Sequence, residues 1–245
     1  MRLAMTFIVT IGVAAGASAR AADWYTGVPT DGPVQPSVAV DVSVEGTSQR
    51  EVAATVIGTI APFAPLAQSG FRFRLGGLAG RYDYNSSTLG RVDGVMEGGS
   101  FLAGYEWVTP NASISAFLGA DVTNNSLSRN DQNNPVHGSR GGAKMEVNFY
   151  VTPTLLTMIS GVANYSTNHD AYYARAKFGY MINDQIYLGP EILALGDDFF
   201  QQWRIGGHAT GFRFGGVQFG VSGGFLNDRV RGGGAYGILD TRYMF

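Results

Sequence analysis

Residues 37–45 read Ser-Val-Ala-Val-Asp-Val-Ser-Val-Glu, and the alternation in this stretch indicates the fold class. Valine occupies every second position from Val38 to Val44, while the positions between are small or polar, as at Asp41 and Ser43. Successive side chains of a β-strand point to opposite faces. The stretch therefore predicts a strand with one apolar side and one polar side.

The same alternation recurs along the rest of the chain. Residues 143–151 place Ala, Met, Val, Phe and Val on one face, against Lys, Glu, Asn and Tyr on the other. Residues 172–178 repeat the pattern, with Arg175 and Lys177 on the polar side. Turn-forming residues divide the chain into about twelve such segments. The strands are predicted at 37–47, 51–61, 70–83, 91–108, 111–124, 139–152, 154–166, 170–182, 184–196, 200–213, 216–228 and 233–245.

The lengths of these segments and of their connections indicate a membrane barrel. Many segments exceed the roughly five or six residues usual in soluble sheets, and they suit membrane strands of about 9–11 residues. Tight turns at Pro110, Pro153 and Gly215 alternate with longer connections such as 125–138. The connection at 62–69 is an exception, because it is long for a periplasmic turn. Bacterial barrels pair short periplasmic turns with longer outer loops. We therefore expect an all-β, closed antiparallel outer-membrane β-barrel, with a soluble β-sandwich as the main alternative.

Aromatic residues and the C-terminus agree with this expectation. The chain stops at Phe245, and Leu239, Thr241 and Tyr243 alternate before it. This ending resembles the signal read by the outer-membrane assembly machinery, so that machinery and outer-membrane lipid are the expected partners. An aromatic girdle is expected near the periplasmic and outer rims. Its predicted members are Phe71, Phe73, Tyr105, Trp107, Phe149, Phe178, Tyr180, Phe219, Tyr243 and Phe245 at the first rim, and Tyr172, Trp203 and Phe225 at the second.

The first residues have the pattern of an export signal. Arg2 precedes the apolar run 3–15, and Ala17-Ser18-Ala19 fits a small-x-small cleavage site. The run is shorter than the roughly 20 residues that a spanning helix needs. We expect a signal peptide at 1–21, a periplasmic segment at 22–36 and the barrel at 37–245, with the cell outer membrane as the destination.

Composition excludes several classes of function. The 245 residues contain no cysteine, which rules out disulfides and thiolate metal sites. Lys and Arg number 17 and Asp and Glu 19, for a formal net charge of −2, so nothing favours nucleic-acid binding. No cofactor and no metal site is expected.

The polar faces of the strands should line the lumen, because an Arg or Lys facing lipid at mid-depth costs about 2–4 kcal/mol. These side chains form either a charged pore or sugar-binding lumen, or a salt-bridge network that fills a narrow barrel. The sequence leaves both interpretations open. The lumen-lining candidates are Arg72, Arg74, Lys144, Glu146, Arg175, Lys177, Glu191, Arg204, His208, Asp240 and Arg242.

Candidate catalytic groups are few. His137 and Ser139 have the spacing of some outer-membrane lipid hydrolases, but no acid partner is evident, so no catalytic residue is assigned and a non-enzyme is expected. The asparagine-rich segment 124–134 and the pair Asp197-Asp198 are expected to form solvated loops.

Several short motifs together carry a family resemblance. They are Asp23–Gly27, Gly104–Trp107, Asn133–Val136, Gly196–Phe200 with Gln202–Arg204, and Gly233–Tyr236. In this order they resemble the BcsS family of alphaproteobacterial cellulose biosynthesis proteins. The resemblance implies an outer-membrane barrel that assists cellulose biosynthesis, secretion or anchoring, with cellulose or other cellulose-synthesis proteins as partners.

The family resemblance brings no established catalytic residues. Tyr172, Tyr173 and Trp203 are the glucan-stacking candidates under this interpretation. The alternatives are a barrel-based lipid-modifying hydrolase and a narrow small-solute pore.

Overall fold

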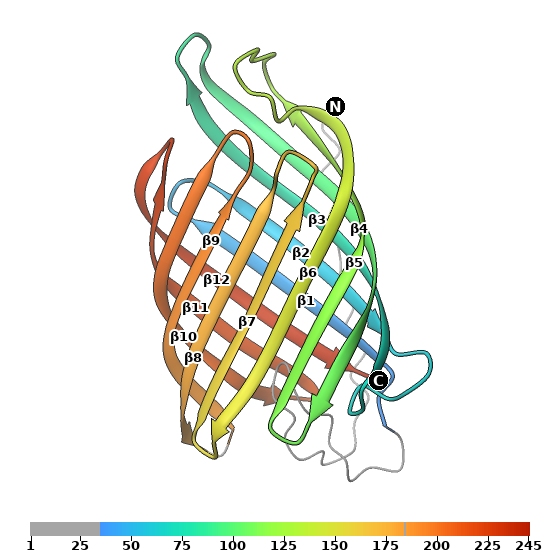
Figure 1. Ribbon diagram of the computed structural model, residues 1–245. Helices are drawn as coiled ribbons and strands as arrows, with labels where there is room; N and C mark the ends of the chain where they lie inside the picture. The colour runs from blue at the N-terminus through green and yellow to red at the C-terminus, as the bar shows by residue number, and fades with distance from the viewer. Residues whose placement is uncertain (1–34, 184) are drawn as a thin grey trace.

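The computed structural model describes residues 35–183 and 185–245, which form one closed β-barrel (Figure 1). The expected signal peptide and most of the expected periplasmic segment lie outside the described residues. The twelve strands are β1 (Val38–Thr47), β2 (Val52–Ile60), β3 (Gly70–Ser86), β4 (Gly90–Thr109), β5 (Ala112–Leu127), β6 (Gly138–Thr154), β7 (Thr157–Ser166), β8 (Tyr172–Asn183), β9 (Ile186–Gly196), β10 (Gln201–Phe214), β11 (Val217–Asp228) and β12 (Gly232–Met244).

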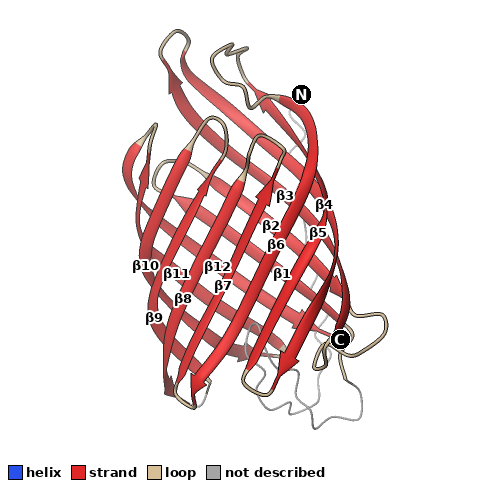
Figure 2. Ribbon diagram, viewed as in Figure 1, coloured by secondary structure: helices blue, strands red, loops and turns tan. Residues whose placement is uncertain are grey.

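Each strand pairs antiparallel with its neighbours in the sequence, and β1 pairs with β12 to close the barrel. The closing register runs from Ala39 opposite Met244 to Thr47 opposite Tyr236. Figure 2 shows strands joined by loops and turns throughout. The predicted closed antiparallel barrel is therefore confirmed, with boundaries close to the predicted ones. Within the described ranges, no helix is long and apolar enough to cross a membrane.

The two ends of the barrel differ. The turn end holds Val38, Met244, the tight turns that follow β4, β6, β8 and β10, and the longer β2–β3 loop, residues 61–69. The loop end holds the other connections, and there the β3–β4 hairpin rises above the rest of the rim (Figure 1). β4 is the longest strand, at 20 residues, and β3 and β6 follow at 17 residues each.

Apolar side chains cover the outside of the barrel, as alternation requires. Leu75, Phe101 and Leu118 are exposed on this surface. Outward-facing rings gather near the rims. Pairs in contact are Phe71 with Tyr105, Tyr105 with Trp107 and Tyr243 with Phe245 at the turn end, and Trp203 with Phe225 at the loop end.

One glycine serves a bulge that bends the wall. Gly211 has a φ of 98° and lies where the β10–β11 register shifts between Thr210 and Phe212. A Cβ there would lie 1.8 Å from the carbonyl oxygen of Gln185, so both the backbone angle and the space require glycine.

Candidate functional site

The β2–β3 loop is fastened to the inside of the barrel at the turn end. Arg72 is fully buried, and its Nε lies 2.8 Å from the Glu106 carboxylate. The same guanidinium donates hydrogen bonds to the backbone carbonyls of Ala64, Pro65 and Gln68. A planar group with five donors suits this role, because it satisfies several acceptors at once. Leu66 of the loop packs with Ala39, which faces the lumen.

The lumen behind this loop is filled by side chains. Tyr150, Met158 and Tyr187 form a buried apolar cluster contributed by β6, β7 and β9. His208 is buried near them, and its Nε2 lies 3.0 Å from the carbonyl oxygen of Phe178. None of these inward-facing residues borders the cavity described below. Buried side chains therefore fill this part of the lumen.

A belt of ion pairs crosses the middle of the barrel. Arg74 pairs with Glu146, and the Arg74 guanidinium also lies over the Phe117 ring. Arg242 Nε lies 3.3 Å from Asp41 Oδ1. Arg175 Nη2 lies 3.0 Å from Asp240 Oδ2. We call this belt the ionic floor, and its members are Asp41, Arg74, Glu146, Arg175, Asp240 and Arg242.

Glu191 anchors the β8–β12 side of the ionic floor. Its carboxylate lies 2.7 Å from Arg175 Nη2 and 3.7 Å from Lys177 Nζ. It also accepts hydrogen bonds from the hydroxyls of Ser222, at 2.9 Å, and Tyr236, at 3.0 Å. A buried carboxylate is tolerated when it is paired and hydrogen-bonded in this way.

Another buried cation, Arg204, lies nearer the loop end. It donates to both carboxylate oxygens of Glu45 at 3.0 and 3.2 Å. Its Nε donates to Gln202 Oε1 at 2.6 Å, and its guanidinium lies 5.3 Å from the centre of the Tyr236 ring. Glu45 lies on the polar face of the alternating stretch 37–45. Its place in that alternation was therefore a sequence signal that it faces the lumen.

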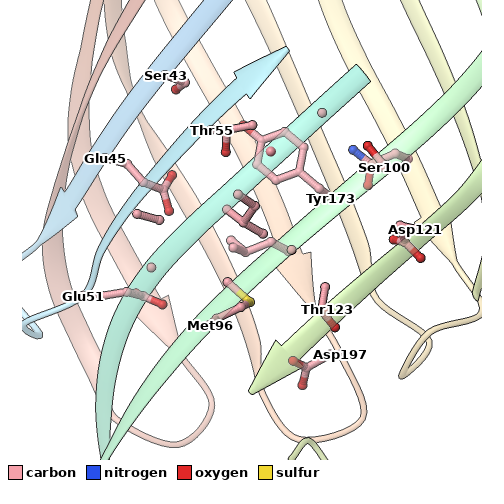
Figure 3. Close-up of a pocket in the computed structure, with 18 of the residues that line it drawn as sticks. Ser43, Glu45, Glu51, Thr55, Met96, Ser100, Asp121, Thr123, Tyr173 and Asp197 are labelled. Atoms are coloured by element: carbon pink, nitrogen blue, oxygen red, sulfur yellow. The ribbon is translucent and has the colours of Figure 1, made fainter. Parts of the chain in front are cut away.

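A cavity of about 400 Å³ lies between the ionic floor and the loop end (Figure 3). The β2–β4 wall carries small side chains such as Ala53, Thr55 and Ser100, and these leave room that larger groups would fill. Tyr173 of β8 and Leu195 of β9 line the opposite wall of the cavity.

The cavity walls mix apolar surface with acceptors and donors. Figure 3 shows Thr55, Ser100, Asp121, Thr123 and Tyr173 around the space. A site that combines mainly apolar walls with a few placed polar groups is typical of small-ligand pockets. Within the described residues, no group of three or more His, Asp or Glu is placed to hold a metal ion.

Tyr84 ties together three segments at the mouth of the cavity. Its hydroxyl donates to Asp131 Oδ2 and accepts from Asn134 Nδ2, both at 3.1 Å. Its ring meets the Phe199 ring edge-on, with centroids 4.8 Å apart. Tyr84 belongs to β3 and Phe199 to the β9–β10 loop, so this contact spans the barrel. We call Tyr84, Asp131, Asn134 and Phe199 the mouth cluster.

The expectation that segment 124–134 is solvated is wrong for part of it. Asp131 and Asn134 are buried, as is Asn125. The physical reason is that their polar atoms are satisfied locally: Asp131 Oδ1 accepts from the Asn133 N–H, and Asn134 Oδ1 accepts from the Val136 N–H. Asparagine and aspartate readily close such turns on their own backbone.

Asp197 is likewise a cavity-lining residue, whereas Asp198 is exposed as expected. The Asp197 carboxylate accepts from the N–H groups of Phe199, at 2.7 Å, and Phe200, at 3.0 Å. Burial raises the pKa of Asp197, and these two N–H groups oppose that rise. The residue therefore shapes the loop that carries Phe199.

A histidine lies beside the mouth. His169 Nδ1 lies 3.3 Å from the Arg140 guanidinium and 3.8 Å from the Asp198 carboxylate. Burial lowers the pKa of His169, the Arg140 charge lowers it further, and the Asp198 charge opposes both effects.

The candidate catalytic pair His137 and Ser139 is not assembled. Ser139 is exposed and donates a hydrogen bond to Asn124 at 3.0 Å, and no hydrogen bond joins His137 to Ser139 in the described chain.

The predicted lumen residues fall into two groups. Arg74, Lys144, Glu146, Arg175, Asp240 and Arg242 line the cavity. Arg72, Lys177, Glu191, Arg204 and His208 are buried inside the barrel but do not line it.

Of the three stacking candidates, only Tyr173 lines the cavity. Trp203 is 49% exposed and packs on Phe225 on the outer face of the wall. Tyr172 precedes Tyr173 in the same strand, so its side chain points to the opposite face, away from the lumen. Sequence reasoning missed the mouth cluster, because its loop residues carry no periodic signal.

Solved structures that share this architecture are outer-membrane barrels. An outer membrane channel from Pseudomonas putida F1 has a TM-score of 0.54 at 13% identity, over 89% of this chain and 99% of that one. The translocator domain of the autotransporter NalP from Neisseria meningitidis has a TM-score of 0.52 at 14% identity, over 88% and 90%. At these identities the likeness concerns the fold alone. No curated protein matches the sequence.

The family model described as cellulose biosynthesis protein BcsS matches residues 42–245. This span runs from β1 to the last residue and includes the ionic floor, except for Asp41, and the whole mouth cluster. The chain therefore belongs to the BcsS family of cellulose biosynthesis proteins, as an outer-membrane-type β-barrel.

Proposed function

We propose that this barrel retains cellulose at the cell surface by holding glucan in its loop-end cavity, without catalysis and without conducting glucan through the lumen. Family membership supports a part in cellulose biosynthesis, and the fold supports an outer-membrane site of action. In barrels of this kind the longer loops face outward, so the cavity would open toward secreted polymer.

The single observation that carries the proposal is the contrast between the two halves of the lumen. A polymer passing through would have to displace the β2–β3 loop, the cluster of Tyr150, Met158 and Tyr187, and the ionic floor. Removing one partner from a buried ion pair typically costs about 3–5 kcal/mol. Opening the belt would break several such pairs together, which favours a binding role over a conduit.

Deletion of the gene tests the retention role. We expect total cellulose to stay near the wild-type amount while the cell-attached fraction falls and cellulose appears in the medium. Reintroducing the wild-type chain should restore attachment. An unchanged attached fraction would contradict the proposal, and a fall in total cellulose would instead indicate a role in synthesis or export.

A conductance measurement distinguishes the retention role from the alternative of a small-solute pore. The purified barrel in a planar lipid bilayer should show no steady open-channel current, because side chains fill the turn-end half of the lumen. A stable ohmic conductance from the wild-type chain would overturn the binding role and favour the pore.

A further inference from the structure

We infer that the loop-end cavity binds the end of a glucan chain, and not its middle. This inference rests on the proposed function only in taking glucan as the ligand. It adds which part of the polymer is recognised, at which residues and from which side.

The first step is that the cavity is closed at its base. The ionic floor lies across the barrel, and behind it Lys177, Glu191, Tyr150 and Tyr187 are all buried. A ligand therefore enters from the loop end, past Tyr84 and the half-buried Phe199. The interior of a polymer chain cannot reach such a space without folding back on itself, whereas a chain terminus can.

The second step is chemical. A β-linked glucose ring has an apolar face and a rim of hydroxyl groups. The cavity offers both kinds of partner, since the aromatic side chains of Tyr173 and Phe200 line it together with the polar side chains of Asp121 and Asn164. Tyrosine provides a large apolar surface with a polar tip, which suits contact with a sugar ring at a wet site.

Two polar groups on the wall remain available to ligand hydroxyls. Lys144 lines the cavity, and among the described residues it has no carboxylate within ion-pair distance. Asp121 accepts one hydrogen bond, from Ser166 at 2.7 Å, which leaves further acceptor capacity on the carboxylate. A hydroxyl-rich terminus can donate to Asp121 and accept from Lys144, which an unbranched alkyl chain cannot.

The third step concerns size. Pockets for small ligands are about 300–1,000 Å³, and this cavity of about 400 Å³ lies near the lower limit. It can hold a few sugar rings, so the remainder of a long chain would project beyond the mouth cluster. Affinity should therefore rise with oligosaccharide length and then level off.

The experiment is calorimetric titration of the purified full-length barrel in detergent with cello-oligosaccharides of increasing length. Three further ligands carry a bulky substituent at the reducing end, at the non-reducing end or at both. We expect binding that reaches a plateau with length. Blocking both ends should weaken binding at least tenfold, and one of the two singly blocked ligands should bind like the free sugar, which identifies the inserted end.

Matched variants locate the site. Thr55→Trp should fill the cavity and abolish binding, whereas Val56→Trp adds the same ring to the lipid-facing side of the same strand and should not. Tyr173→Ala should weaken binding at least tenfold, whereas Tyr180→Ala removes the same residue type from the outer face of β8, where it is 50% exposed. Folding of each variant is checked by its heat-modifiable migration on gels, and Tyr173→Ala decides the question if Thr55→Trp does not fold.

The outcomes keep this inference apart from the proposed function. Equal binding of the doubly blocked sugar would overturn chain-end recognition, even if cells lacking the gene shed cellulose. Binding that survives both Thr55→Trp and Tyr173→Ala would place glucan outside the cavity and overturn the site. End-specific binding in a protein whose deletion leaves cellulose attachment unchanged would support the site and contradict the retention role.

Discussion

The two halves of this lumen are built from the same twelve strands but hold different contents. In the turn-end half, Tyr150, Met158 and Tyr187 pack together, and Arg72 is fully buried against Glu106. In the loop-end half, the β2–β4 wall carries Thr55 and Ser100 and leaves a cavity. Strand number sets the width of a barrel. The comparison shows that, in a barrel of one width, the size of the inward-facing side chains decides whether a part of the lumen is a packed core or an open cavity.

The halves also differ in how their polar groups are held. Just behind the ionic floor, the buried carboxylate of Glu191 is held by two cations and two hydroxyl groups. The mouth cluster instead joins Tyr84 of β3 to residues of two loops, and Phe199 and Asp197 keep part of their surface exposed. Proteins open locally where buried contacts are few. We therefore expect stability to concentrate at the floor and adjustability at the mouth.

The largest effect should come from Glu191→Ala. This change leaves the buried cations Arg175 and Lys177 with Asp240 as their remaining carboxylate partner. Breaking a buried ion pair from one side costs about 3–5 kcal/mol, so urea unfolding in detergent micelles should shift by about that amount. Glu97→Ala, an exposed carboxylate on β4, is the control and should change stability by less than about 0.5 kcal/mol. Equal stability of the two variants would show that the floor does not hold the barrel together.

Much of the wall could be predicted from the sequence. Strand period, turn residues and the cost of charge in lipid placed Arg74, Glu146 and Asp240 inside the barrel, where they line the cavity. Periodicity describes one strand at a time, however. It cannot show that Arg74 of β3 meets Glu146 of β6, because that pairing depends on closure and on strand tilt.

The connections were less predictable, for the same physical reason. The segment 62–69 is long for a periplasmic turn, and in the structure Arg72 holds its backbone at the turn end of the barrel. Nothing in the local sequence shows that Tyr84 reaches Phe199 across the barrel. The sequence assigns Trp203 both to the aromatic girdle and to glucan stacking, and its exposure on the outer face beside Phe225 agrees with the girdle alone.

Tyr84→Phe should have an intermediate effect, confined to the loop end. It removes the hydroxyl that Asp131 and Asn134 share while they remain buried. Leaving a buried group unsatisfied costs about 1–3 kcal/mol, so residues 128–137 should exchange backbone amides roughly tenfold faster or more, without a matching loss of global stability. Tyr165→Phe, which removes an exposed hydroxyl bonded to Asp170, is the control. Unchanged exchange at 128–137 would show that the loop is held without Tyr84.

The smallest effect should be a pH response beside the mouth. The pKa of His169 is lowered first by burial and then by the charge of Arg140, with His137 adding to this and Asp198 opposing it. The neutral imidazole is therefore favoured in the folded loop. Its contribution to stability is complete above the unfolded pKa of about 6.5 and is lost as pH falls through the lower, folded value. Amide exchange at residues 167–171 and 197–200, corrected for intrinsic rates, should be less protected at pH 5.5 than at pH 7.5, while β6 and β9 stay unchanged. His169→Gln should remove this difference, and a response that persists in the variant would assign it to another group.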